Sequence, residues 1–170
     1  MTPNGGIFGG DGAWLNPYEY DGERQVDPMA CVAAALSTAI IQASLDCGRF
    51  DQSRQERILR LVGRMPDGAI RYVDAVAWLR AQDFGIPLEF GLVIAGGPAR
   101  PLASLRVRRG TAFVANLAAP FGPGHAVAIV SNQPGRIFDP ADGGWRTPTA
   151  ADEERWVAGS CLLLVVRGQP

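Results

Sequence analysis

The order of helix-forming and strand-forming segments is the feature that most limits the fold of this 170-residue chain. Apolar residues first recur at helical spacing, and after about residue 85 they form short runs between glycine- and proline-rich turns. Helices followed by consecutive strands predict an α+β fold with an antiparallel sheet. The expected helices are 27–45, 52–62, 70–81 and 151–157, and the expected strands are 88–94, 111–117, 125–130, 136–138 and 161–166.

The first expected helix, residues 27–45, is apolar on nearly all sides. Asp27 is a suitable N-cap and Pro28 fits a first helical turn, while the alanines that follow favour helix. A helix with no polar face must be buried in the core. We therefore expect this N-terminal helix to lie at the centre of the fold, packed on the antiparallel sheet.

Length and charge restrict the organisation and the partners of the chain. We expect a glycine-rich N-terminal arm, residues 1–24, followed by a single domain, residues 25–170. The 16 basic and 17 acidic residues give a net charge of −1. Nucleic-acid binding requires a basic excess or a basic stripe, so we expect no nucleic-acid partner.

Three further features bear on location and cofactors. No apolar run is long enough for a membrane span and no secretory signal is present, so we expect a cytoplasmic protein or an effector secreted without a signal peptide. A single histidine and the absence of a CxxC pattern predict no metal site and no cofactor. All basic residues are arginines, which excludes a catalytic lysine.

Cys31 is the candidate nucleophile. It falls in the first turn of the expected central helix, where unpaired N–H groups and the helix dipole favour a thiolate. Taken alone, Cys31 also fits a small core residue. Cys47 and Cys161 are expected to be packing residues.

The remaining candidates follow in a fixed order along the chain. His125, the only histidine, starts an expected strand after a glycine-rich loop, and Asp139 ends the next strand. A turn near residues 133–135 would bring the imidazole and the carboxylate together on adjacent antiparallel strands, where Asp139 could orient His125. Asp142 and Asp27 are the alternative carboxylates. Gln25, six residues before Cys31, could complete an oxyanion hole with the Cys31 N–H.

These motifs resemble the papain-like cysteine peptidases. The resemblance is carried by Gln25-x5-Cys31, by Gly-His-Ala-Val at 124–127, by Phe-Asp-Pro at 138–140, and by Trp-x-x-Gly at 156–159 before an apolar strand. It is nearest to compact bacterial double-glycine leader peptidase domains and to papain-fold effectors. Val32 stands where the leader peptidases usually have glycine after the cysteine.

The resemblance implies a papain-like fold and cysteine protease (thiol protease) activity on a peptide or protein substrate. Cys31, His125 and Asp139 would form the catalytic triad, with Gln25 in the oxyanion hole. Two alternatives stay open. One is a glutamine deamidase or transferase that uses the same residues, and the other is a catalytically inactive module that binds peptides or acts as an adaptor.

Overall fold

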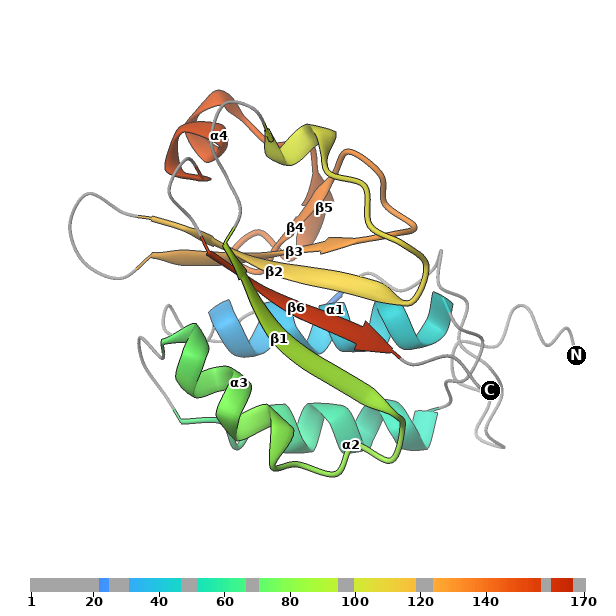
Figure 1. Ribbon diagram of the computed structural model, residues 1–170. Coiled ribbons are helices and arrows are strands. Elements are labelled where there is room, and N and C mark those ends of the chain that lie inside the picture. The colour runs from blue at the N-terminus through green and yellow to red at the C-terminus, as the bar shows by residue number, and fades with distance from the viewer. Residues whose placement is uncertain are drawn as a thin grey trace, which may run out of the picture.

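The computed structural model describes residues 22–24, 31–46, 52–66, 71–94, 100–118, 124–156 and 160–166. Within these residues the fold is α+β, as the order of segments predicts (Figure 1). The helices are α1 (Cys31–Asp46), α2 (Gln52–Val62), α3 (Tyr72–Arg80), the 3-10 helix η1 (Leu102–Ser104) and α4 (Ala150–Trp156). The strands are β1 (Leu88–Ile94), β2 (Thr111–Leu117), β3 (His125–Val130), β4 (Ile137–Asp139), β5 (Gly144–Arg146) and β6 (Ser160–Val166).

The strands form one sheet in the order β1-β6-β2-β3-β4-β5. Every neighbouring pair is antiparallel, which confirms the expected sheet type. The last described strand, β6, lies between β1 and β2 and pairs with both, so it joins β1 to the rest of the sheet. β1 and β5 are the two edge strands, and β3 and β4 are neighbours near the β5 edge.

Helix α1 is the buried central helix that the sequence predicts. Its apolar residues cover the whole circumference, and Leu36, Ile40 and Ile41 are fully buried. Figure 1 shows α1, α2 and α3 on one side of the sheet and α4 on the other. The side chains that pack with α1 alternate along β3, at Ala126 and Ala128, as the two-residue period of a strand requires.

The opposite face of the sheet has its own apolar cluster. Val127 and Ile129 of β3 point to this face, where they join Leu102 of η1 and Trp156 of α4. β3 is therefore covered on both faces, and only its first residue, His125, is partly open to solvent. This placement leaves a polar site at the end of a strand that is otherwise embedded in the core.

The sequence prediction misses β5 and shifts several boundaries. β5 has only three residues and begins with a glycine, so it shows no alternating pattern. It forms because β4 pairs with it, with Phe138 opposite Trp145. β4 runs from Ile137 to Asp139 rather than over 136–138, and α4 begins at Ala150 rather than 151.

Residues 22–24, the described end of the expected N-terminal arm, contact the core. Gly22 has a φ of +91°, and a Cβ at this position would lie 2.3 Å from the Phe138 ring. Only glycine fits this combination of backbone conformation and close approach. The Glu23 N–H donates to the Thr38 hydroxyl of α1 at 2.9 Å. The remainder of the arm, residues 1–21, lies outside the described residues, as does the expected helix start at Asp27.

Truncation of Ile40 to alanine tests the central position of α1. The fully buried side chain leaves a cavity, and we expect the free energy of unfolding to fall by about 2–5 kcal/mol. Val73→Ala in α3 is the matched control, because Val73 is 52% exposed and should cost no more than about 0.5 kcal/mol. Urea unfolding measures both. Equal costs for the two variants would contradict a core built on α1.

Candidate active site

Cys31 is the first residue of α1 and is a buried, free thiol. Burial by itself raises the pKa of this thiol. Hydrogen bonds from the His125 side chain and from the N–H groups of Ala126 and Val32 outweigh burial, so the net pKa of Cys31 is lowered. The first N–H groups of a helix have no partner within the helix, which makes them available to a thiolate.

His125 and Asp139 meet across the β3–β4 pair. Nε2 of His125 lies 2.6 Å from Oδ1 of Asp139, as expected for adjacent antiparallel strands joined by a short turn. The turn lies at the expected place, because the Arg136 N–H donates to the Gln133 carbonyl. Since Asp139 occupies Nε2, the nitrogen that remains for the Cys31 thiol is Nδ1.

The contacts of the pair shift both pKa values. The hydrogen bonds to Asp139 and then to Cys31 raise the pKa of His125 to about 9, against the opposing effect of burial. Burial would raise the pKa of Asp139, but hydrogen bonds from His125 and Arg146 hold it well below its usual range. Around neutral pH the pair is therefore an imidazolium and a carboxylate.

Of the two alternative carboxylates, the structure describes Asp142 but not Asp27. Asp142 is 67% exposed and its carboxylate lies 3.6 Å from Nε of Arg146, not beside the imidazole. Asp139 is thus the carboxylate that contacts His125. Asp27 and the proposed oxyanion residue Gln25 lie outside the described residues.

The side chains of the other two cysteines lie outside what the structure describes. Cys47 lies outside the described residues. Cys161 is in β6, with its backbone paired to Val93 of β1 and Ala115 of β2. The expectation that both are packing residues remains a prediction.

Arg146 is a site residue that the sequence prediction missed. Its Nη2 donates to Asp139 Oδ2 at 2.7 Å and to Asp152 Oδ1 at 3.1 Å, and its Nη1 donates to the other oxygen of Asp152. Arg146 lies on the unpredicted strand β5, so no local pattern pointed to it. The only sequence signal was Thr149-x-x-Asp152, a capping-box pattern that marks the start of α4 but not a link to the site.

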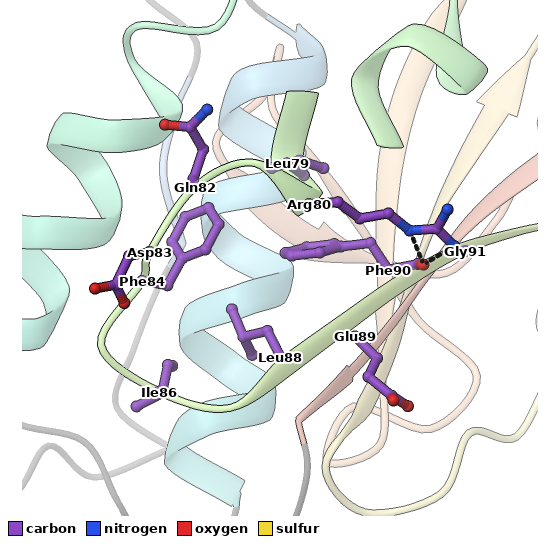
Figure 2. Close-up of a pocket in the computed structure, with 10 residues that line it drawn as sticks. All are labelled: Leu79, Arg80, Gln82, Asp83, Phe84, Ile86, Leu88, Glu89, Phe90 and Gly91. Atoms are coloured by element: carbon purple, nitrogen blue, oxygen red, sulfur yellow. Dashed lines mark hydrogen bonds between the residues drawn. The ribbon is translucent and has the colours of Figure 1, made fainter. Parts of the chain in front are cut away.

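A pocket of about 480 Å³ lies away from these residues, between the end of α3 and β1. Figure 2 shows Phe84, Leu88 and Phe90 around it, with the Arg80 guanidinium bound to the Phe90 carbonyl at 2.7 and 3.1 Å. β1 is one edge of the sheet, whereas the Cys31–His125–Asp139 contacts lie toward the other edge. The pocket is therefore separate from the candidate active site.

Over the described ranges, no group of three or more His, Cys, Asp or Glu side chains has an arrangement that could hold a metal ion. None of the helices in the described part of the chain combines the length and the apolar character needed to cross a membrane.

Comparisons with known proteins gave no relative: no protein-family model, curated protein or solved structure matches this chain. The site brings a thiol, an imidazole and a carboxylate into contact in that order. Groups of these three types in this order can serve as a nucleophile, a proton carrier and an orienting group.

The raised pKa of His125 can be measured directly, because the chain has one histidine and its imidazole signals need no assignment. We expect NMR titration to give a pKa of about 9, and Asp139→Asn to lower it toward the ordinary 6.5, because the main contact that favours the imidazolium is lost. Asp83→Asn is the matched control, since Asp83 pairs with Arg57 on helix α2, away from the site. An unchanged titration in Asp139→Asn would contradict the contact.

The same shifts fix the sign of the pH dependence of stability. The raised pKa of His125 contributes to the free energy of unfolding. This contribution is fully present below about pH 6.5 and is lost as the pH rises through about 9. The Asp139 contribution has the opposite sense: it is present above about pH 4 and is lost as the pH falls toward the lowered pKa.

Proposed function

We propose that the chain is a cysteine-dependent acyl-transfer hydrolase, a papain-like cysteine protease that cleaves a peptide or protein substrate through a thioester. The observation that carries this proposal is the continuous contact Cys31–His125–Asp139, with the thiol at the start of a buried helix. The papain-like assignment is supported by the order of the candidate residues along the chain and by a central helix packed on an antiparallel sheet.

In the first half of the proposed reaction, the Cys31 thiolate attacks the carbonyl carbon of the scissile peptide bond and forms a C–S bond. The C–N bond breaks as the His125 imidazolium gives its proton to the departing amine. Asp139 stays ionised and holds His125 through Nε2, so that Nδ1 faces the reacting atoms. The product of this half is a thioester on Cys31.

In the second half, neutral His125 takes a proton from water, and the resulting hydroxide attacks the thioester carbonyl. The C–S bond breaks, the acid product leaves and the thiolate–imidazolium pair is restored. The oxyanion of each tetrahedral intermediate needs donors beside Cys31. We assign this role to the Cys31 N–H and the Gln25 amide, the latter from its place six residues before the cysteine.

The pH dependence of Cys31 alkylation tests the thiolate–imidazolium pair without knowledge of the substrate. In a Cys47→Ser/Cys161→Ser background, we expect rapid labelling by iodoacetamide that persists well below pH 7, because the pKa of Cys31 is lowered. An ordinary thiol with a pKa of about 8.5 is only about 0.3% ionised at pH 6. The proposed thiolate–imidazolium pair keeps most of Cys31 ionised at pH 6, so His125→Ala should slow labelling there on the order of 100-fold, as read by intact mass.

Two variants provide the matched controls for this experiment. Asp139→Asn should slow labelling at low pH, whereas Asp142→Asn, which changes an exposed carboxylate near the same arginine, should leave it unchanged. Labelling that follows an ordinary thiol and ignores His125 would instead indicate a binding module without catalysis.

Digestion of a peptide library, compared with Cys31→Ala, then identifies the reaction. New fragments in the wild type alone support proteolysis. A mass gain of about 1 Da without fragments would show that the same acyl-enzyme chemistry acts on side-chain amides, and would overturn the protease assignment.

A further inference from the structure

The two oxygens of the Asp139 carboxylate have separate partners. Oδ1 faces His125 Nε2 at 2.6 Å and also accepts from the Ala141 N–H at 3.0 Å. Oδ2 accepts from Arg146 Nη2 at 2.7 Å. Because Arg146 is on β5 and Ala141 is in the turn after β4, the carboxylate is held from two directions besides that of the imidazole. Its rotation about the Cβ–Cγ bond would break the Arg146 contact.

Arg146 is in turn fixed by Asp152. This aspartate is buried, and both of its oxygens accept from the guanidinium. Asp152 also accepts from the Thr149 N–H at 2.7 Å, and its own N–H donates to the Thr149 hydroxyl, so it belongs to the cap of α4. The position of Arg146 is thus tied to a helix end packed on the far face of the sheet.

The charge of Asp152 bears on how Arg146 can influence the site. The guanidinium is paired with the buried Asp152 carboxylate through two hydrogen bonds, and this opposite charge offsets part of its own. Its hydrogen bond to Asp139 remains directional. In the described residues, the charged and titratable groups in contact with His125 are Cys31 from α1 and Asp139 from β4. Arg146 therefore reaches the imidazole only through Asp139.

We propose that Arg146 is a positioning residue of the active site: by holding Oδ2 of Asp139, it keeps Oδ1 directed at Nε2 of His125. This inference rests on the proposed function, since it assigns Arg146 a role in the reaction described above. Arg146 does not touch the thiol or the reacting atoms, and it acts through the carboxylate that orients the imidazole.

A pair of double variants separates orientation from charge. Arg146→Met/Asp152→Asn and Arg146→Gln/Asp152→Asn both remove one positive and one negative charge, and both keep an acceptor for the Thr149 N–H. They differ in that glutamine retains an N–H donor for Asp139 and methionine does not. Orientation by hydrogen bonding predicts that the two variants behave differently.

The first measurement is the pKa of His125 by NMR in the full chain carrying Cys31→Ala, where the thiol no longer contributes. We expect Arg146→Met/Asp152→Asn, called the methionine pair below, to lower the pKa of His125 by about 1, because Asp139 loses its fixed orientation. Arg146→Gln/Asp152→Asn, called the glutamine pair, should retain most of the original pKa. Equal behaviour of the two pairs, whether both shift or neither does, would overturn the proposal, as would a rise in the methionine pair. If the methionine pair fails to fold, Arg146→Ala/Asp152→Asn is the second donor-free variant and is judged in the same way.

The second measurement is Cys31 alkylation at pH 6 in chains that retain the cysteine. The methionine pair should slow labelling several-fold relative to the glutamine pair, while Arg57→Gln, which breaks an arginine–aspartate pair elsewhere in the fold, should not slow it. Slow labelling of the wild type itself would refute the proposed function. The His125 titration in the Cys31→Ala chain would still report whether Arg146 positions Asp139, so the two failures are distinguishable.

Discussion

The packing of α1 against β2 and β3 is the contact on which the candidate site depends. The helix is apolar on nearly all sides, so the hydrophobic effect favours its burial between the sheet and the helices α2 and α3. Once buried there, its first residue lies beside the first residues of β3, where the Ala126 N–H and the His125 imidazole reach the Cys31 thiol. Cys31 and His125 are far apart in the sequence, and the core is what brings them together.

Burial at this place is tolerated because each charge has an opposite charge next to it. The contacts run from Cys31 to His125, Asp139, Arg146 and Asp152, with negative and positive groups in alternation. An isolated buried charge would be costly, whereas an opposite charge and hydrogen bonds offset much of that cost. The same alternation lowers the pKa of the Cys31 thiol. In the proposed reaction, the cation beside the buried sulfur is also the group that carries the proton.

Much of the candidate site could be predicted because its parts lie on regular elements. Cys31 was assigned from an apolar helix, and the His125–Asp139 contact from two strands joined by a short turn. Arg146 could not be assigned in this way. Its strand has three residues and no apolar alternation, follows a turn that ends in Gly143, and forms only because β4 pairs with it.

The sequence by itself determined the helix-then-strand order, the buried character of α1 and the candidate residues Cys31, His125 and Asp139. These follow from periodicity and composition within windows of a few residues. Only the tertiary structure decided that Asp139 rather than Asp142 faces the imidazole, that Nε2 is the nitrogen it binds, and that Arg146 holds its other oxygen. Such choices depend on strand pairing and side-chain direction, which bring distant residues into contact and leave no local pattern in the chain.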